Sequence, residues 1–474
     1  MRALRSGSLR KERKHGSAII LTALFLVVII PIIGLAVDGA NVYLMNNQVN
    51  SAVAAAVLAG TRSLSTGETV DQQRIGAQNL AQAVFNADIS GIPGLALPSA
   101  NCTSSTNVSS CFTVLPDDKT HLRKVQGVVT ANLPVMLLGL MHVYTVPVSM
   151  TLSASRRDVN IMMVLDHSAG MAYSTALSEM KNDANAFVRL FANGRDNIGL
   201  VTFTGAPYLA APLPNKDFLT SSPSVPDMIN SVTVPMTSYL NTAAALSVAY
   251  EQLHQLNEPG ALNVIVLFTD GIPGAFTGDF APYLATGQTI CSTSQSPLVG
   301  VLYTNPRETL YGGFASPNWQ TATDNPPPDT IPAPGCNTIG AGLITYMPSS
   351  DYFGNSTTGA YTINNNSGGY YGDGTLNVST RNITGASVNA FDAAASRIRG
   401  DTSIQPVIYA IGLTVNPAVV PPDPTLMKRI TNDPNSAYFN PSQPSGQYIE
   451  VPTPGALQTA FISIASQVLK LAAN

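Results

Sequence analysis

The longest run of apolar residues in the 474-residue chain lies near its N-terminus. Residues 16–37, GSAIILTALFLVVIIPIIGLAV, include no charged side chain. A helix rises about 1.5 Å per residue, so a segment of this length crosses a hydrocarbon core of about 30 Å. The pattern predicts a transmembrane helix over residues 16–38. A cleaved secretory signal is the alternative, but such a signal has a shorter apolar part, whereas this run continues into Asp38 and a helical pattern.

Residues 39–156 combine a helical pattern with two alternating patterns. Small and apolar residues without proline predict that the helix continues to about Phe85, with a break near Ser65–Glu68. Further on, residues 125–135 and 144–156 alternate apolar and polar positions, which predicts two strands. The apolar segment between them, MLLGLM, is too short to cross a membrane and predicts a turn. These elements predict a small α+β region.

From residue 157 onward, strand and helix patterns alternate. The strand patterns are continuous apolar runs, which are typical of strands buried on both faces, and the helix patterns repeat apolar residues at helical spacing. The strands are predicted at 159–165, 197–203, 262–271 and 406–413, and the helices at 174–193, 238–256, 389–399 and 454–471. This alternation predicts an α/β fold with a doubly wound parallel sheet, formed by residues 157–271 and 385–474.

Residues 272–384 interrupt the alternation. They are rich in Gly, Ser, Thr, Asn, Tyr and Pro and have few charges, with DNPPPDTIPAPG and NNNSGGYYGDG as extreme cases. A loop of this length inside a compact domain is either functional or disordered. We expect an exposed insertion. It either makes polar contacts with a partner or is a mobile surface loop without a binding role.

Charged residues are unevenly distributed along the chain. Residues 1–15 contain six of the 24 Lys and Arg residues and one acidic residue, so the remainder carries a net charge of −9. An acidic body is not expected to bind nucleic acid. The basic flank on one side of the apolar segment predicts a cytoplasmic tail at residues 1–15. We therefore expect a single-pass protein of the inner (cytoplasmic) membrane, with its bulk periplasmic or extracellular.

The four cysteines fall into two local pairs on the exported side of the predicted membrane helix. Because exported compartments are oxidising, we predict that Cys102 bonds to Cys111 and that Cys291 bonds to Cys336. Four cysteines allow three pairings, and four free thiols in a reducing compartment are the alternative. No Cys-x-x-Cys or Cys-His spacing indicates zinc binding or redox catalysis.

The N-terminal part resembles the TadE/TadG-like Flp pilus-assembly family. The resemblance rests on the basic lead, Gly16 at the start of the apolar run, GLAVDGANVY at its end and the alanine-rich QVNSAVAAAVLAG that follows. It also includes the later strand, LPVMLLGL and closing strand. Val53 stands where the family commonly has an aspartate. The resemblance implies a pilin-like α+β region over residues 39–156.

The order of strands and helices after residue 157 is similar to that of a von Willebrand factor A domain. The segments MMVLDHSAGM and VLFTDG stand at the ends of the first and the later apolar strands, where this domain has its site. TadG-like proteins couple such a domain to a membrane segment. The two resemblances together imply a TadG-like protein with a long insertion in its von Willebrand A domain.

The resemblance also implies a candidate metal site. Metal-binding von Willebrand A domains use Asp-x-Ser-x-Ser after the first strand, a later Thr and an Asp after the fourth strand, and they bind Mg²⁺ or Mn²⁺ through oxygens. Asp166, Ser168 and Asp270 match this pattern, whereas Gly170 replaces the second serine and Leu240 takes the threonine position. The site is therefore either degenerate, binding metal weakly, or purely structural, with Asp166 accepting hydrogen bonds from the following turn. His167 is expected to be a loop residue that points away from it.

No catalytic motif is recognisable in the sequence, which contains no Gly-x-Ser-x-Gly, phosphate loop or His-Glu-x-x-His. We expect a non-enzymatic, membrane-anchored component of Flp-type (tight adherence) pilus assembly or secretion. Its expected partners are the membrane and pilin-like or other pilus-assembly proteins held by the von Willebrand A domain, and no small-molecule substrate is expected. The alternative function is a metal-dependent surface adhesin that binds an external ligand.

Overall fold

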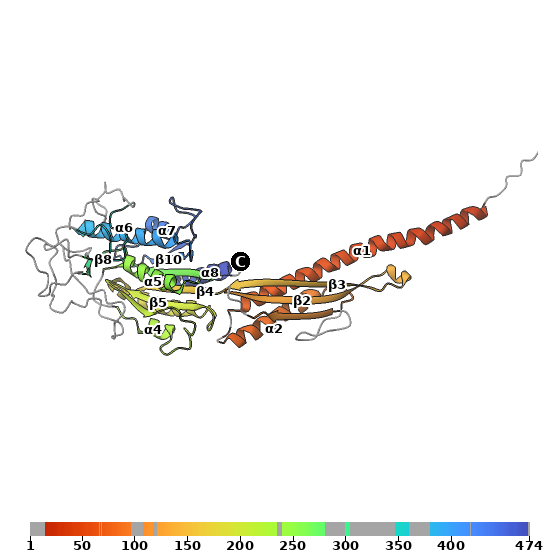
Figure 1. Cartoon of the computed structure of the whole chain (residues 1–474), viewed down its shortest axis with the longest axis horizontal. Coiled ribbons are helices and arrows are strands. Elements are labelled where there is room, and N and C mark those ends of the chain that lie inside the picture. Colours follow the sequence, from red (N-terminus) through yellow and green to blue (C-terminus); the bar gives the residue numbers. More distant parts are fainter. Residues whose placement is uncertain are drawn as a thin grey trace, which may run out of the picture. The chain divides into compact units, whose positions relative to one another are not determined.

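The computed structural model describes residues 15–472, with gaps at 66, 68, 96–107, 117–120, 235–238, 280–298, 304–346, 360–379 and 418. The chain forms two compact units (Figure 1). The N-terminal unit comprises Met1–Thr61, Ala77–Leu115 and Lys124–Ala154, and the C-terminal unit comprises Arg62–Gly76, Pro116–Arg123 and Ser155–Asn474. Most of the predicted basic tail and most of the insertion at 272–384 lie outside the described residues.

The N-terminal unit begins with a long helix, α1 (His15–Ser63), which contains Pro31. Among the described residues, α1 alone is long and apolar enough to cross a membrane. In the first half of α1 most apolar side chains are exposed, and Leu24 and Leu35 are 68% and 62% exposed. A second helix, α2 (Val70–Ile89), follows after a short break at the predicted place, and it belongs to this unit from Ala77 onward. The helical pattern of the sequence is thus confirmed.

Three strands form a sheet in the order β1-β2-β3, and all of it lies in this unit except residues 122–123 at the start of β2 and 155–157 at the end of β3, which belong to the C-terminal unit. They are β1 (Val108–Val114), β2 (Leu122–Pro134) and β3 (Thr145–Arg157). A single turn of 3₁₀ helix, Leu138–Met141, connects β2 to β3, so the predicted pair of strands and the apolar turn are found. The first strand was not predicted, because its sequence VSSCFTV alternates only weakly between apolar and polar residues.

Small side chains on α1 allow this helix to pack closely in the core of the N-terminal unit. Val53 and Ala56 are fully buried, and Phe85 of α2 and Phe112 of β1 pack ring against ring with centroids 5.4 Å apart. Val53, which departs from the pattern of the resembled family, is therefore an apolar core contact. A carboxylate at this depth would need a partner that the apolar neighbours do not provide.

The C-terminal unit contains a six-stranded sheet in the order β11-β10-β7-β4-β5-β6. Its strands are β4 (Val159–Asp166), β5 (Asn197–Phe203), β6 (Pro207–Ala211), β7 (Leu262–Thr269), β10 (Val407–Leu413) and β11 (Tyr448–Val451). Neighbouring strands are parallel except that β6 runs antiparallel to β5. Every residue of β4, β5, β7 and β10 is buried, as the continuous apolar runs predicted.

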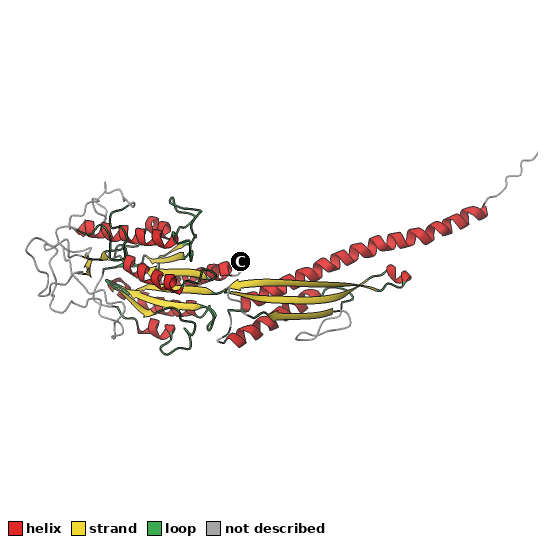
Figure 2. Ribbon diagram, in the orientation of Figure 1, coloured by secondary structure: helices red, strands yellow, loops and turns green. Residues whose placement is uncertain are grey.

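Helices cover both faces of this sheet (Figure 2). One face packs against α3 (Ala176–Val188), α4 (Val225–Ser231) and α8 (Leu457–Ala472), and the other packs against α5 (Thr242–Leu256), α6 (Thr380–Arg399) and α7 (Pro424–Ile430). Successive residues of β4 alternate between the two cores, with Met163 in the first and Met162 in the second. The predicted doubly wound α/β sheet is confirmed.

The described ends of the predicted insertion belong to the C-terminal unit. They include an antiparallel pair of strands, β8 (Ala275–Asp279) and β9 (Val299–Tyr303). The Tyr303 ring stacks on Tyr239 with centroids 3.8 Å apart, and Asn241 Nδ2 donates a hydrogen bond of 2.9 Å to Thr277 Oγ1. These contacts attach the strand pair to the N-terminal end of α5, beside the carboxyl edge of the main sheet.

A buried charge cluster lies near the amino end of β4. Arg156 donates two hydrogen bonds to Asp196, at 3.1 and 2.8 Å, and Arg123 forms an ion pair with Asp158 at 3.0 Å. The guanidinium groups of both arginines are almost fully buried. The positive charges of the two arginines are therefore balanced by the negative charges of the two aspartates inside the C-terminal unit.

Candidate functional site

The site predicted from the sequence lies at the carboxyl edge of the six-stranded sheet. Asp166 is the last residue of β4, and Asp270 directly follows β7. These strands are parallel neighbours in a register that places Leu165 opposite Phe268, so the two carboxylates meet at the same edge. Ligands in open α/β sheets bind at this edge. The structure therefore brings Asp166 and Asp270 together, as the sequence predicted.

The Asp166 carboxylate is fully buried and accepts hydrogen bonds at both oxygens. Its Oδ1 accepts from the backbone N–H of Ser168 at 2.8 Å. Its Oδ2 accepts from Thr269 Oγ1 at 2.8 Å and from the backbone N–H of Asp270 at 3.1 Å. These donors belong to the turn after β4 and to the end of β7. The carboxylate thus ties two neighbouring strand ends together, which matches the structural role considered in the sequence analysis.

The Asp270 carboxylate is in a less favourable setting. Its Oδ1 accepts a hydrogen bond of 3.3 Å from Ser168 Oγ, but its Oδ2 is buried and has no hydrogen-bond partner among the described residues. Burial, and then the neighbouring charge of Asp166, raise the pKa of Asp270 well above its ordinary value. Burial also raises the pKa of Asp166. The pair is therefore more stable with a proton on Asp270 than with two negative charges.

Gly170 is needed for this arrangement. It lies in a single 3₁₀ turn, Ala169–Ala172, that follows Ser168. A Cβ on Gly170 would stand 2.0 Å from Asp270 Oδ2 and 3.0 Å from Val419 Cγ2. The Asp270 carboxylate therefore occupies the space in which the side chain of a serine at position 170 would begin.

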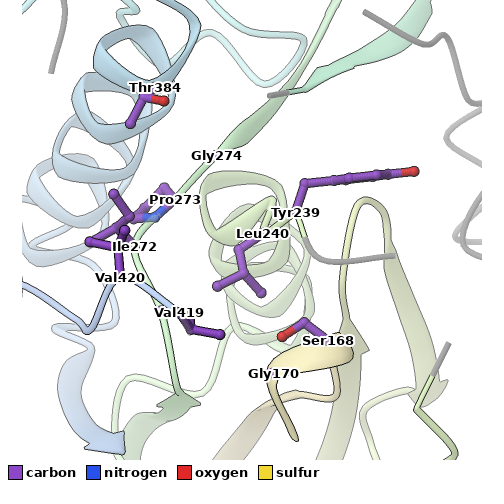
Figure 3. A pocket seen from close by; sticks show the side chains of 11 residues that line it. Ser168, Gly170, Tyr239, Leu240, Ile272, Pro273, Gly274, Thr384, Val419 and Val420 are labelled. Carbon is purple, nitrogen blue, oxygen red and sulfur yellow. The ribbon is translucent and has the colours of Figure 1, made fainter. Parts of the chain in front are cut away.

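Apolar side chains close the site from the solvent side. Leu240 precedes α5, and Val419 lies in the segment between β10 and α7. A Cβ on Gly271 would lie 3.0 Å from Leu240 Cδ1 and 3.1 Å from Val419 Cγ1, so both side chains pack over the turn that follows β7. Figure 3 shows Leu240, Val419 and Ser168 converging on the same space. The same segment is tied to the site by Asn416 Nδ2, which donates a hydrogen bond of 3.2 Å to the Gly170 carbonyl.

These residues do not fit a Mg²⁺ or Mn²⁺ ion that exchanges an outside ligand. Such an ion needs a shell of about six oxygens with an open position. Both Asp166 oxygens already face N–H and O–H donors, Gly170 and Leu240 supply no side-chain oxygen, and Val419 covers the edge. Within the described ranges, no group of three His, Cys, Asp or Glu side chains gathers. Weak metal binding by Asp166, Ser168 and Asp270 is not tested by these contacts, which favour the alternative of a purely structural role.

A small pocket opens beside the closed carboxylate pair. It has a volume of about 40 Å³ and is lined by Ser168, Gly170, Tyr239, Leu240, Gly271, Ile272, Pro273, Gly274, Thr384, Val419 and Val420 (Figure 3). Most of these lining residues are apolar. Pockets for metabolites usually enclose about 300 Å³ or more. This one suits a single small apolar side chain.

The remaining residues singled out in the sequence lie elsewhere. Cys111 is on β1 and is disulfide-bonded, whereas Cys102, Cys291 and Cys336 lie outside the described residues, so both predicted pairings stay predictions. His167 is buried, with Nδ1 2.8 Å from the carbonyl oxygen of Thr233. This contact gives the imidazole a partner outside the carboxylate pair.

Sequence reasoning missed three residues of the site. Thr269 donates to Asp166, Asn416 holds Gly170, and Val419 covers the edge. Thr269 stands immediately before Asp270 in VLFTDG, so its place on the strand could have indicated its role. Asn416 and Val419 lie in an irregular segment and carry no pattern that points to the site.

Two family models match the chain. The von Willebrand factor type A domain model matches residues 161–272, and the Tad model, described as Flp pilus-assembly TadE/G-like, matches residues 16–83. No curated protein is similar enough in sequence to count as a match. The two matches cover the carboxylate pair and the apolar helix, the two features on which the sequence resemblances were based.

Several solved structures are similar to the chain in part. The PilB minor pilin from Streptococcus sanguinis is 14% identical, covering 77% of this chain and 78% of that one, with a TM-score of 0.38. The vWF domain of the type V pili tip protein Mfa5 from Porphyromonas gingivalis is 14% identical, covering 67% and 97%, with a TM-score of 0.36. A von Willebrand factor type A protein from Catenulispora acidiphila is 9% identical, covering 77% and 50%, with a TM-score of 0.34. Likenesses of this size carry no argument about what this chain binds.

Proposed function

Because the chain is TadG-like, joining a TadE/G-like segment to a von Willebrand factor A domain, we propose that it is a non-enzymatic, membrane-anchored component of Flp-type (tight adherence) pilus assembly or secretion. The observation that carries the proposal is the presence of both family segments in one chain. In this proposal α1 spans the inner (cytoplasmic) membrane with its N-terminus in the cytoplasm. The C-terminal unit then lies outside that membrane and holds a pilin-like or other pilus-assembly partner.

The carboxyl edge of the sheet is the proposed contact with the partner. The closed pair of Asp166 and Asp270 supports binding by packing, without a bridging metal ion. The adjacent pocket between Leu240 and Val420 accepts one apolar side chain of a protein partner. Its small volume supports the expectation that no small-molecule substrate binds there.

A function without catalysis is part of the proposal, and one side-chain cluster has residue types that also occur in catalytic sites. The arrangement most like a catalytic one joins His254 Nδ1 to Asp401 Oδ2 at 3.1 Å on the surface. However, the nearby Ser403 hydroxyl donates to the Asp401 carboxylate at 2.5 Å and not to the imidazole. Tyr250 donates to the same carboxylate at 2.8 Å. Ser403, Tyr250 and His254 thus surround the Asp401 carboxylate, and the cluster is a hydrogen-bond network centred on Asp401.

Deletion of the gene, followed by complementation, tests this function. We expect the deletion to reduce surface pili and adherence, and the unaltered gene to restore both. Ile272→Arg, which fills the pocket with a charged side chain, should not restore them, although the protein is still made and inserted. Ile462→Arg is the matched control, because Ile462 is 44% exposed on α8, away from the pocket.

Two outcomes would contradict the proposal. If pili and adherence are unchanged after the deletion, the protein has no function in pilus assembly, and the proposal is wrong. Adherence that is restored by the unaltered gene but lost on adding a chelator, and lost in Asp166→Ala, would favour the alternative of a metal-dependent surface adhesin.

A further inference from the structure

The turn between β2 and β3 is fixed to α1 through one carboxylate. Asp38 Oδ1 accepts a hydrogen bond of 3.1 Å from the backbone N–H of Met136. Asp38 Oδ2 accepts from the backbone N–H groups of Leu137 and Leu138, at 2.8 and 2.6 Å. All these residues belong to the N-terminal unit, and Figure 1 shows the end of the β2–β3 hairpin beside α1. Residues 136–144, named here the hairpin tip, therefore have a defined position along the helix.

That position overlaps the apolar segment of α1. A Cβ on Gly34 would lie 3.1 Å from Leu137 Cβ, so the hairpin tip reaches at least from Asp38 to Gly34. Four residues of helix correspond to about 6 Å along its axis. Gly34 lies inside the uncharged run of residues 16–37. The hairpin tip thus extends about one helical turn toward the middle of the apolar segment.

The hairpin tip exposes large apolar side chains. Met136 is 82% exposed and Tyr144 is 64% exposed, and Leu137, Met141 and Val143 are also exposed. The surrounding sequence has no charge to keep them in water, because residues 125–155 contain no Asp, Glu, Lys or Arg. Exposed apolar side chains on the neighbouring turn of α1, among them Ile33 and Leu35, make the apolar surface continuous from the helix to the hairpin. A surface of this kind is typical of an interaction site.

The backbone of the hairpin tip is also suited to an apolar environment. Unpaired N–H groups are costly in lipid. Asp38 satisfies three N–H groups, the Val135 N–H donates to the Tyr144 carbonyl, and the Val143 N–H donates to the Leu138 carbonyl. The same contacts give the Asp38 carboxylate its partners, so this acidic side chain does not lie unpaired at the membrane boundary.

We propose that the hairpin tip is a second membrane contact, inserted into the boundary between headgroups and acyl chains on the exported side. The inference rests on the membrane anchoring by α1 in the proposed function. Lipid is the occupant that the structure favours, because the exposed surface continues that of the spanning helix at the same depth. Amphipathic segments lie about 5–10 Å deep at this boundary, and tyrosine is enriched there.

Depth-dependent quenching of tryptophan fluorescence tests this inference on the full chain in phosphatidylcholine vesicles. The chain has one tryptophan, Trp319, so Trp319→Phe provides a silent background. Met136→Trp reports on the hairpin tip, and Leu24→Trp on the middle of the apolar segment. Val128→Trp is the matched control, because Val128 is 42% exposed on β2 outside the tip.

We expect lipids brominated near the headgroups to quench most of the Met136→Trp emission, and lipids brominated deep in the acyl chains to quench Leu24→Trp. Val128→Trp should be quenched by neither. If Leu24→Trp is quenched while Met136→Trp behaves like Val128→Trp, the hairpin tip is not in the membrane but the anchor stands. If Leu24→Trp is not quenched, the proposed anchor fails, and the inference about the tip fails with it.

A second variant tests the role of Asp38. Asp38→Ala in the Met136→Trp chain removes the acceptor of three N–H groups, so we expect the tip to leave the boundary and its quenching to fall to the Val128→Trp level. Asp88→Ala is the control, because Asp88 lies exposed on α2. Full quenching that persists in Asp38→Ala would show that this carboxylate does not hold the tip in place.

Discussion

Asp270 Oδ2 lies 2.0 Å from the point where a Cβ on Gly170 would stand. The glycine in DHSAGM is therefore an integral part of the closed site, because it makes room for a buried carboxylate. The same relationship explains why a serine cannot be placed at position 170 without moving Asp270. Gly170 makes room for the Asp270 carboxylate, and Leu240 covers the turn beside it. These two positions of the sequence therefore account for the closed carboxylate pair at the carboxyl edge.

Gly170→Ala should destabilise the C-terminal unit. The added methyl overlaps Asp270 Oδ2 and approaches Val419, and overpacking of this kind costs about 1–3 kcal/mol. Gly76→Ala is the control, because nothing lies within 4 Å of its Cβ position on α2, and a helical Gly→Ala change stabilises by about 0.5–1 kcal/mol. Thermal unfolding of the full chain in detergent, followed by circular dichroism, compares the two. Equal unfolding temperatures for Gly170→Ala and the unaltered chain would show that the Asp270 carboxylate has room to move.

The stability of the site should depend on pH in a defined direction. The folded pKa of Asp270 is raised by burial and by the charge of Asp166, so the folded state keeps a proton that the unfolded chain releases at its ordinary value of about 4. The free energy of unfolding therefore falls as pH rises above that value, by at most about 1.4 kcal/mol for each pH unit. Asp270→Asn carries no titrating proton and should reduce this slope.

Unfolding of the unaltered chain and of Asp270→Asn between about pH 5 and about pH 8 measures the effect. The variant should gain stability relative to the unaltered chain as pH rises. Parallel curves for the two proteins would mean that Asp270 does not hold a proton in the folded state.

The buried ion pairs near the amino end of β4 should contribute strongly to the stability of the C-terminal unit. Asp196→Ala leaves the guanidinium groups of Arg156 and Arg123 buried without their shared partner, which costs about 3–5 kcal/mol. Asp71→Ala removes an exposed ion pair with Arg74 and should change stability by at most about 1 kcal/mol. Chemical denaturation of both variants provides the comparison. A change in Asp196→Ala as small as that in Asp71→Ala would mean that water reaches the cluster.

The disulfide pairing can be read from peptides. Cys111 is disulfide-bonded, and we predict Cys102 as its partner and a second bond between Cys291 and Cys336. Proteolysis without reductant should release two pairs of disulfide-linked peptides, one with Cys102 and Cys111 and the other with Cys291 and Cys336. Mass spectrometry identifies both pairs. A peptide that links Cys111 to Cys291 or Cys336 would contradict the local pairing.

The elements of the fold with strong periodicity could be predicted from the sequence. Apolar runs such as those of β4 and β7 are stable at the centre of a parallel sheet that has helices on both faces. The pattern therefore predicts that these segments are central strands. Short elements with mixed composition were missed, among them β1, the antiparallel edge strand β6 and helix α7. Their conformation depends on tertiary contacts and only weakly on local pattern.

The candidate site could be predicted only in part, for a similar reason. The positions of Asp166 and Asp270 follow from the ends of two adjacent parallel strands. The cover by Val419 and the attachment of the hairpin tip to Asp38 join segments far apart in the sequence. A single sequence has no local signal for contacts of this kind.

Titration of Mg²⁺ and Mn²⁺ into the full chain in detergent, with Asp166→Ala beside it, tests most directly the central claim that this domain holds its partner without a metal ion. Because the Asp166 oxygens already face donors and Leu240 and Val419 close the edge, we predict no saturable heat at roughly millimolar metal for either protein. Saturable binding at roughly micromolar metal that disappears in Asp166→Ala would contradict the claim and would show that the edge opens to admit an ion.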